Sequence, residues 1–332
     1  MSKVYTIIAE PDNATINKAV ELLKAGESVA LPTETVYGLA GNALEPSAIA
    51  KIFAVKNRPQ DNPLIVHVSD VEMARGLGLE VHSQAEKLAE MFWPGPLTMV
   101  LKKVNDTIPP QISCGLDTVA VRVPADETFL KIIKKGSQNN SQLPLAAPSA
   151  NASGSPSPTA AAHVYSDLNG KIPLIIDGGE CKIGIESTVI AFDNTKIRIL
   201  RPGAVTPEML SEFAETLIDD AVYEKVAGTA QSPGVKHRHY SPKATVTAVI
   251  ADSEQAFLDY SLNHAHGRNF AVASPDAQTL FAKFRQLDEL GANQIFIRLP
   301  EPAGLGLALY NRIVRAAEFN VIDLRIIDLH GN

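Results

Sequence analysis

Cysteine is scarce in this sequence: its 332 residues include only Cys114 and Cys181. The two lie far apart, and neither belongs to a CxxC or a Cys/His spacing, which argues against a zinc site. Two isolated thiols in a chain of this length are typical of proteins in a reducing compartment. We therefore expect a cytoplasmic protein.

Long apolar segments are also missing. No run of about 18 uninterrupted apolar residues occurs, so the sequence predicts no membrane-spanning helix. The first residues, MSKVYTIIAEPDNAT, have too short an apolar stretch for a signal peptide and lack a small-residue cleavage site. We expect a first strand and a helix cap there, and no contact with a membrane.

An excess of basic charge is absent as well. The chain has 30 Lys and Arg residues against 37 Asp and Glu residues, a net charge of −7, and neither half of it is basic. This balance argues against broad, non-specific binding to nucleic acids, which depends on many phosphate contacts. Any weak contact with tRNA would have to use a local patch, and the best candidate is KHRHYSPK at residues 236–243.

What the sequence does contain is an alternation of strand and helix signals through its first 200 residues. A helical period of apolar residues runs from Ile16 to Leu23 and ends at Gly26, and a second helix around 48–53 stops before Lys56. Apolar runs, some continuous and some alternating, predict strands at 4–9, 28–33, 64–68, 97–102, 119–123, 173–177, 187–192 and 197–200. That mixture predicts a strongly twisted mixed sheet with helices packed against it.

The remainder of the chain divides into a linker and a second domain. Regular patterns weaken over 204–243, where a helix is predicted at PEMLSEFAETL and is followed by a segment rich in Gly, Ser, Pro and basic residues. From 244 to 332, strand and helix signals alternate in the order expected for a small doubly wound α/β domain. We therefore predict a first domain at 1–203, a linker at 204–243 and a Rossmann-like domain at 244–332.

Lys56 and Arg58 stand two residues apart in KNRPQDNPLIVH, just before a predicted strand. In an extended backbone their side chains would lie on one side, about 7 Å apart. Their repulsion, about 2 kcal/mol at an effective dielectric of about 20, favours an anion between them. The alternative is a pair of solvated surface cations, although Pro59, Asn62 and the strand that follows count against it.

A second informative segment is PSANASGSPSPT, from Pro148 to Thr159, which contains four Ser, one Asn and one Thr. It lacks the GxxxxGK[ST] pattern of a P-loop but could bind phosphate with hydroxyls and backbone N–H groups. Thr33 and Thr35 follow a strand in LPTETVYGLA, at the carboxyl end where ligands bind in α/β sheets. Each segment, taken alone, could equally be an ordinary polar loop or turn.

Three further polar residues interrupt or end apolar strands. Arg122 and Arg201 each need an anionic partner if buried, either an internal carboxylate or a bound anion, and their repeated placement at strand ends favours a bound anion. His67 is either a core histidine with satisfied hydrogen bonds or a hydrogen-bond donor to a ligand. Cations in one segment and neutral hydrogen-bonding groups in another predict a site for a phosphate-bearing ligand.

The succession of motifs along the chain resembles that of the longer, two-domain form of the YrdC family, the threonylcarbamoyl-AMP synthases. The matching motifs are PTETVYGL, KxRPxxNPLIVH, FWPGPLT, AVRVP, the PSAN…SGxPSPT block, ESTV, ILRPG and, at residues 239–242, HYSP. The resemblance covers nearly the whole chain, with the last domain matching mainly as architecture. It implies a YrdC-like domain with a concave cleft, followed by a Rossmann-like α/β domain.

By this resemblance, the protein would condense L-threonine, bicarbonate and ATP into threonylcarbamoyl-adenylate and pyrophosphate. A separate tRNA threonylcarbamoyl transferase would then move the threonylcarbamoyl group to the adenine beside the anticodon of certain tRNAs. Mg²⁺ is the expected cofactor, bound through the ATP phosphates and not through protein side chains.

The resemblance also implies roles for individual residues. Four would surround the triphosphate: Lys56, Arg58, Ser149 and Asn151. The threonine contacts would be Thr35, His67, Arg122, Ser187 and the backbone at Ala147. The nucleotide contacts would be Arg58, Asn62, Thr118, Ser149, Ser157, Arg201 and Tyr240. A tyrosine contact from the linker implies that the HYSP motif folds over the mouth of the cleft.

Two other functions are compatible with parts of the sequence. One is an RNA-binding or ribosome-assembly factor without catalysis, supported by the basic stretch at 236–243 and opposed by the acidic balance of the chain. The other is a carbamoyltransferase of the hydrogenase-maturation type, which contains a related domain. Such chains resemble multidomain proteins with CxxC zinc fingers upstream, and this sequence has none.

Overall fold

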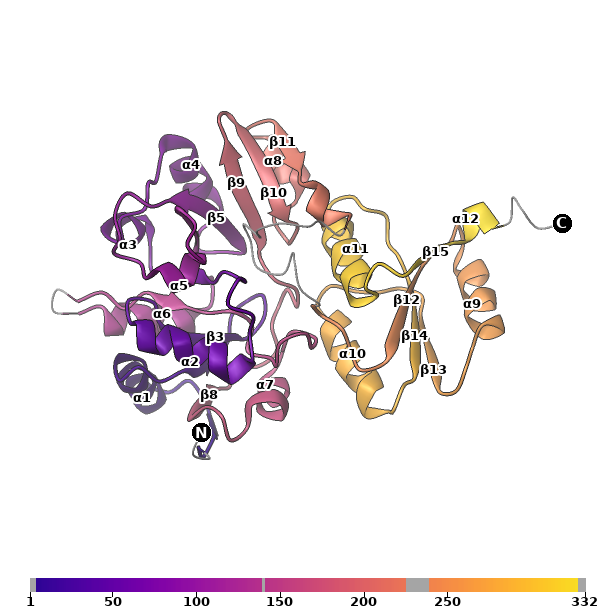
Figure 1. The fold of residues 1–332 in the computed structure, drawn as a ribbon, viewed down its shortest axis with the longest axis horizontal. Coiled ribbons are helices and arrows are strands. Elements are labelled where there is room, and N and C mark those ends of the chain that lie inside the picture. Colours follow the sequence, from indigo (N-terminus) through magenta and orange to yellow (C-terminus); the bar gives the residue numbers. More distant parts are fainter. Residues whose placement is uncertain (1–3, 139–140, 225–238, 328–332) are drawn as a thin grey trace.

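A computed structural model of the chain describes residues 4–138, 141–224 and 239–327. The elements form two α/β units, each built on its own sheet (Figure 1). Helices α10 (Leu280–Glu289) and α11 (Leu305–Ala316) lie between the two sheets. The second unit therefore faces the first through helices and not through a sheet edge.

The larger sheet has eleven strands among the described residues, in the order β1-β8-β2-β3-β7-β4-β6-β5-β9-β10-β11. Their bounds are β1 Ile7–Ala9, β2 Val29–Leu31, β3 Gly38–Asn42, β4 Ile65–His67, β5 Leu97–Lys102, β6 Thr118–Arg122, β7 Leu145–Ala146, β8 Leu174–Ile176, β9 Thr188–Asp193, β10 Lys196–Arg201 and β11 Thr216–Ile218. Parallel pairs such as β4/β6 and β5/β9 alternate with antiparallel pairs such as β2/β3, β5/β6 and β9/β10. The predicted mixed sheet is confirmed.

Eight α-helices accompany this sheet in the described part of the chain. They are α1 Asn13–Lys24, α2 Pro46–Lys56, α3 Val71–Gly76, α4 Ser83–Phe92, α5 Pro110–Ser113, α6 Glu127–Gly136, α7 Ala161–Leu168 and α8 Pro207–Ser211. The first begins where the Asp12 carboxylate accepts a hydrogen bond from the backbone N–H of Thr15 at 2.7 Å. It ends before Gly26, whose φ of 77° lies in the left-handed region that glycine adopts without strain.

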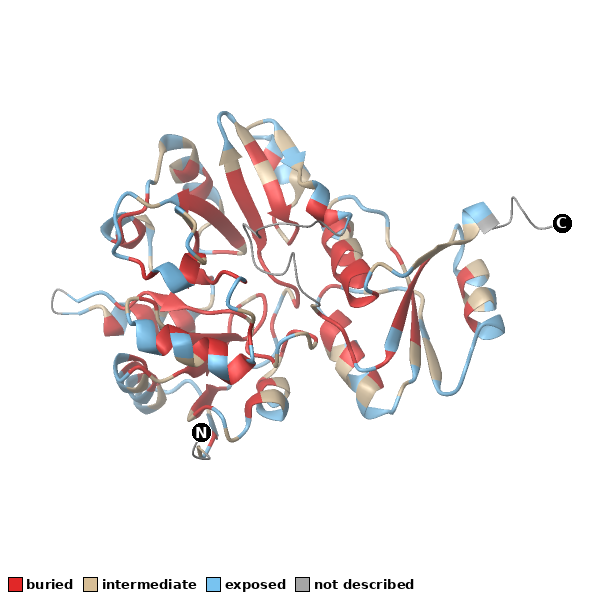
Figure 2. Ribbon diagram, viewed as in Figure 1, coloured by how far each residue is buried: buried red, intermediate tan, exposed pale blue. Residues whose placement is uncertain are grey.

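The core of the larger unit forms where helix faces meet the sheet. The buried residues of α1 recur at a helical period and pack with strand residues from β2 and β8 into one apolar cluster. Members of this cluster include Ile16, Leu23, Leu31, Tyr37, Ile52, Phe129, Ile133 and Ile175. Figure 2 shows buried residues concentrated along the central strands and the helix faces against them.

The smaller unit is a four-stranded parallel sheet in the order β13-β14-β12-β15, as far as the described residues show. Its strands are β12 Thr245–Ile250, β13 Asn269–Val272, β14 Gln294–Arg298 and β15 Val321–Asp323, and its further helices are α9 Glu254–Asn263 and α12 Leu324–Ile327. Helices α10 and α11 cover one face, and α9 lies on the other (Figure 1). The predicted doubly wound arrangement is confirmed.

Two elements differ from their predictions. The helix predicted at PEMLSEFAETL is only α8, and part of its second half becomes strand β11, which pairs in parallel with β10. The sheet therefore continues to Ile218, into the segment that the sequence suggested as a linker. In addition, α2 includes Lys56, and Asn57 closes it in the left-handed conformation, at φ 51° and ψ 45°. The extended backbone expected around Lys56 and Arg58 was wrong, because a helix end and a left-handed turn occupy this position.

Gly203 lies directly against the start of β9. A Cβ atom there would come within 2.4 Å of the Thr188 backbone nitrogen and 2.8 Å of the Glu186 carbonyl oxygen. We expect Gly203→Ala to lower the free energy of unfolding by about 3 kcal/mol, because rigid backbone cannot move aside at little cost. Gly115→Ala is the control: its φ is 82° but nothing lies within 4 Å, so it should cost only about 1 kcal/mol. Urea unfolding measures both, and equal losses would contradict the close packing.

Candidate active site

A pocket opens in the larger sheet, where strands β4, β6 and β10 end. Strand register explains why its polar residues meet there: β4 and β6 are parallel and pair His67 with Arg122, and β10 pairs Arg201 with Val189 at the start of β9. β9 in turn starts beside the start of β5 and the end of β6. Ligands bind at such strand ends in α/β sheets.

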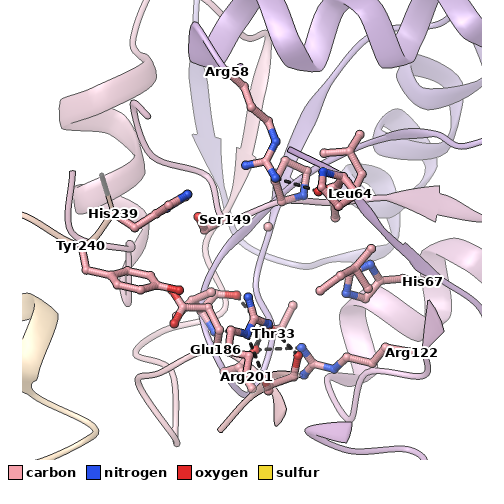
Figure 3. Close-up of a pocket in the computed structure, with 18 residues that line it drawn as sticks. Thr33, Arg58, Leu64, His67, Arg122, Ser149, Glu186, Arg201, His239 and Tyr240 are labelled. Atoms are coloured by element: carbon pink, nitrogen blue, oxygen red, sulfur yellow. Dashed lines mark hydrogen bonds between the residues drawn. The ribbon is translucent and has the colours of Figure 1, made fainter. Parts of the chain in front are cut away.

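The lining of the pocket combines cations, hydroxyls and apolar groups. It consists of Thr33, Thr35, Val36, Gly38, Arg58, Pro63, Leu64, Ile65, His67, Arg122, Ala147, Pro148, Ser149, Glu186, Ser187, Arg201, His239 and Tyr240. Figure 3 shows His239 and Tyr240 on one side and His67 and Arg122 on the opposite side. The open volume is about 50 Å³, enough for a few water molecules but not for a nucleotide.

Lys56 holds the serine-rich loop from behind. Its Nζ donates hydrogen bonds to the carbonyl oxygens of Ser149 and Asn151, the second at 2.5 Å. Burial, and next the charge of Arg58, lowers the pKa of Lys56 well below its ordinary value. These carbonyl oxygens stabilise the buried ammonium group of Lys56. Backbone acceptors therefore offset the repulsion between Lys56 and Arg58, where the sequence had suggested a bound anion.

Arg58 is fixed at its base and lines the pocket. Its Nε donates to the Asn62 carbonyl at 3.1 Å and its Nη2 to the Pro63 carbonyl at 2.7 Å. Burial lowers the pKa of Arg58 to about 10, so the guanidinium stays charged at neutral pH. Its hydrogen bonds to described residues end on neutral carbonyl oxygens, so the site presents a positive charge there.

Arg122 has an internal acid partner. Its Nη2 approaches the Glu34 carboxylate to 2.5 Å, although the angle is not that of a hydrogen bond. Its Nη1 donates to the Thr35 hydroxyl and its Nε to the Gly95 carbonyl, each at 3.0 Å. Of the two partners that the sequence left open for this arginine, the internal carboxylate is the one present here.

His67 lies beside Arg122 and is buried. Its ring is 5.1 Å from that of Phe129, and its Nδ1 has no hydrogen-bond partner among the described residues. Burial, and next the charge of Arg122, lowers the pKa of His67 to about 3. The imidazole is therefore neutral at physiological pH, and the residue lines the pocket.

The serine-rich loop is locked by its own side chains. The Ser149 hydroxyl donates to Asn151 Oδ1 at 2.5 Å, while Asn151 Nδ2 donates to the carbonyls of Ala152 and Ser155. The Ser157 hydroxyl donates to the Glu186 carboxylate. These bonds fix the loop with Ser149 on the pocket wall.

Arg201 and Ser187 meet on the far wall. Arg201 donates from Nε to the Ser187 carbonyl and from Nη2 to the Ser187 hydroxyl, both at 3.1 Å. That hydroxyl also lies 2.8 Å from the hydroxyl of Thr98. Burial lowers the pKa of Arg201 from its ordinary value.

Most of the predicted site residues line this one pocket: Thr35, Arg58, His67, Arg122, Ala147, Ser149, Ser187, Arg201 and Tyr240. Five others do not: Lys56, Asn62, Thr118, Asn151 and Ser157. Four of these stand just behind the lining, since Lys56 and Asn151 hold the loop, Ser157 contacts Glu186, and Asn62 Nδ2 lies 3.2 Å from His239 Nε2. Thr118 begins β6, at the opposite end of the strand from Arg122.

Two ionisable lining residues, Glu186 and His239, were not among the predicted site residues. Glu186 stands in the ESTV motif and His239 in the HYSP motif, so both could have been found as polar members of recognised segments. A carboxylate was not expected in a phosphate site because it repels phosphate unless a cation neutralises it. The cation that does so here, Arg312, lies 126 residues further along the chain.

Neither a metal centre nor a membrane span is found in the part of the chain that the structure describes. No group of three or more His, Cys, Asp or Glu residues there could hold a metal ion. No described helix is both long and apolar enough to cross a membrane.

Known families match both units of the chain. A family described as "Telomere recombination" matches residues 21–203, and one described as "Threonylcarbamoyl-AMP synthase, C-terminal domain" matches 205–318. The threonylcarbamoyl-AMP synthase of Pyrococcus abyssi is 42% identical over 329 residues, which cover 92% of this chain and 95% of the relative. That of Bacillus subtilis is 37% identical, with 92% and 94% covered.

The chain belongs to the threonylcarbamoyl-AMP synthase family. A crystal structure of P. abyssi Sua5 complexed with L-threonine superposes with a TM-score of 0.86 at 40% identity, covering 96% of this chain and 99% of that one. The similarity includes both units, so this chain shares its two-domain architecture with that protein.

The neutral state of His67 has a measurable consequence for stability. Between pH 3 and 6.5 the unfolded chain binds a proton at this residue that the folded protein does not, so the free energy of unfolding rises with pH in this window. We expect wild type to lose about 1 kcal/mol more than His67→Asn when the pH falls from about 6 to about 5. Above about pH 6.5 this residue should contribute no pH dependence. Urea unfolding at each pH measures the difference, and parallel curves for the two proteins would contradict the buried neutral imidazole.

Proposed function

We infer that this protein is an L-threonylcarbamoyl-AMP synthase, a nucleotidyltransferase of tRNA modification that acts on threonine and ATP. The observation that carries this conclusion is the 37–42% identity to named synthases over 92% of the chain. The pocket supports it, since Arg58, Arg122 and Arg201 place three cations around one small space. The finer assignments below are proposals.

Threonine is proposed to bind on the β4/β6 side. The planar guanidinium of Arg122 suits a bidentate contact with the amino-acid carboxylate, which would take the place of Glu34. Thr35, Ser187 and the backbone at Ala147 provide further hydrogen-bonding groups around that position. Neutral His67 could donate or accept a hydrogen bond there without adding charge.

ATP is proposed to bind between the serine-rich loop and the linker. Arg58 and Ser149 line the wall on which the triphosphate would lie, while Lys56 and Asn151 support it from behind. Asn62, Thr118, Ser157, Arg201 and Tyr240 are the other proposed nucleotide contacts. Because His239 and Tyr240 fill one side of the pocket, a ligand of this size requires them to be displaced.

The chemistry requires the site to bring two anions together. The threonine amine adds to bicarbonate-derived CO₂ to give a carbamate, a carbamate oxygen attacks the α-phosphorus, and the bond to pyrophosphate breaks. Carbamate and triphosphate repel each other, so cations that are already fixed in place stabilise the charge that develops on the leaving group. Holding both substrates in line could contribute about 7–11 kcal/mol through proximity.

Mg²⁺ is proposed to enter with the nucleotide. The carboxylates in and beside the pocket already have cation partners, since Glu34 pairs with Arg122 and Glu186 with Arg312. The metal would therefore be held by the ATP phosphates and would add positive charge at the reacting phosphate.

The product is proposed to pass to a separate tRNA threonylcarbamoyl transferase, because a mixed carbamate–phosphate anhydride needs an acceptor amine. The RNA-binding alternative depends on the basic stretch at 236–243, of which residues 236–238 lie outside the described residues, while His239 and Tyr240 line the pocket. The carbamoyltransferase alternative does not account for the match of residues 205–318 to the synthase-specific C-terminal domain.

The proposed reaction predicts that purified protein with Mg²⁺ releases pyrophosphate from ATP only when threonine and bicarbonate are both supplied. Mass spectrometry should detect threonylcarbamoyl-adenylate in the same mixture, and chelation of Mg²⁺ should stop its formation. ATP turnover that ignores threonine would overturn the proposal. Tight, salt-dependent RNA binding without pyrophosphate release would favour the non-catalytic alternative.

The two neighbouring cations predict a second result. Lys56→Ala and Arg58→Ala should each reduce adenylate formation by about a hundredfold or more. Arg58→Ala removes the charge that faces the phosphates, and Lys56→Ala removes the hydrogen bonds that hold the loop carrying Ser149. Lys51→Ala is the matched control on the same helix α2, since Lys51 is partly exposed and pairs with Glu27 at 2.9 Å. Circular dichroism would verify that all three variants fold. Near-full activity of both Lys56→Ala and Arg58→Ala would remove the proposed phosphate clamp.

A further inference from the structure

Glu186 is an unexpected residue in the wall of the pocket. It is 7% exposed and lines the pocket in which we propose that ATP binds. A buried carboxylate there should weaken nucleotide binding, because it repels phosphate at short range and low dielectric. Its presence therefore calls for a compensating cation.

Arg312 of the C-terminal domain provides that cation. It lies on α11, is fully buried at 0% exposure, and donates from Nε to Glu186 Oε2 at 2.7 Å. Its Nη2 donates to the Pro202 carbonyl at 3.1 Å, and Asn311 Oδ1 accepts from its Nη1 at 2.8 Å. The Ser157 hydroxyl donates to the other Glu186 oxygen, so both carboxylate oxygens are held in place.

The same arginine also reaches the linker. Its guanidinium carbon lies 5.2 Å from the centre of the Tyr240 ring, within the range of a cation–π contact. The Tyr240 ring also stacks near Phe281 of α10, with 5.4 Å between ring centres and 26° between ring planes. One residue of the C-terminal domain therefore touches two parts of the pocket wall, Glu186 and Tyr240, which Figure 3 shows near each other.

The ion pair with Arg312 also affects the pKa of Glu186. Burial alone raises the pKa of this carboxyl, but Arg312, then Arg201 and the hydrogen bond from Ser157, bring it below its ordinary value. Without Arg312 the carboxylate would keep its negative charge less fully compensated in the pocket wall.

We propose that Arg312 is a positioning residue for the adenylation reaction. Through it, the C-terminal domain neutralises and orients Glu186, so that this carboxylate does not oppose the binding of the ATP phosphates. This inference rests on the proposed function, because it assumes a phosphate-bearing substrate in the pocket. It gives the C-terminal domain a specific task in catalysis that a mere docking contact would not have.

The test removes each partner of the Arg312–Glu186 ion pair in turn. Arg312→Met leaves a negative charge in the pocket wall, and we expect the ATP dissociation constant to rise by about tenfold or more. Glu186→Gln removes the negative charge and keeps Arg312, so ATP should bind as tightly as in wild type or more tightly. The double variant should bind ATP within about threefold of wild type, because neither charge remains.

Further variants separate positioning from general packing. Arg312→Lys keeps the charge but not the planar fork, so it should fall between wild type and Arg312→Met. Arg315→Met is the control, since Arg315 is buried three residues later on α11 and donates to the Ala221 carbonyl, whereas the ion pair with Glu186 is made by Arg312. It should leave ATP affinity within about twofold of wild type even if it lowers stability.

Isothermal titration calorimetry with ATP and Mg²⁺ measures affinity, and urea unfolding checks that every variant is folded. Equal weakening by Arg312→Met and Glu186→Gln, or failure of the double variant to recover affinity, would overturn the proposal by showing a merely structural ion pair. Threonine-dependent pyrophosphate release by wild type is measured in parallel. If wild type binds ATP but shows no such release, the proposed function fails while the binding comparison still decides the role of Arg312.

Discussion

Burial of positive charge at one edge of a mixed sheet is the constraint on which the rest of this structure depends. Lys56, Arg58, Arg122 and Arg201 are all less than a tenth exposed, and a buried cation costs several kcal/mol unless acceptors surround it. The protein solves this with different acceptors: loop carbonyls for Lys56, backbone carbonyls for Arg58, and a carboxylate for Arg122. Each solution also fixes the position of the cation, so little reorganisation is needed when an anionic substrate arrives.

Two carboxylates, Glu186 in the pocket wall and Glu34 beside it, offset part of the buried positive charge. Glu34 pairs with Arg122 and Glu186 with Arg312, so each acid is matched by one arginine. The two pairs differ in origin, because the first lies within the N-terminal unit and the second joins the two domains. In the proposed complex a substrate carboxylate would replace Glu34 at Arg122, whereas Arg312 reaches the pocket through Glu186 and Tyr240. The C-terminal domain thus influences the charge of the pocket, although its described residues do not line the pocket.

Local patterns in the sequence predicted much of this arrangement. The apolar pattern located β5 to the residue, because the run at 97–102 leaves no competing pattern. Short elements such as β7 and β11 were missed, since two or three residues carry no period and form only through pairing with a neighbouring strand. Motif order identified the family, but the acceptors of individual cations depend on contacts between distant segments. The pairing of Arg312 with Glu186 could not be predicted, because no local feature of α11 distinguishes this arginine from Arg315.

The most direct measurement is a crystal structure with a non-hydrolysable ATP analogue and threonine bound together. We expect the threonine carboxylate on Arg122 in the place of Glu34, and the phosphates between Arg58 and Ser149 with Arg201 nearby. Glu186 should remain paired with Arg312 in that complex. The central claim is that the substrate anions bind to the buried cations of the pocket. It would be contradicted by an empty pocket with both ligands bound elsewhere, or by Arg122 still paired with Glu34 while threonine is bound.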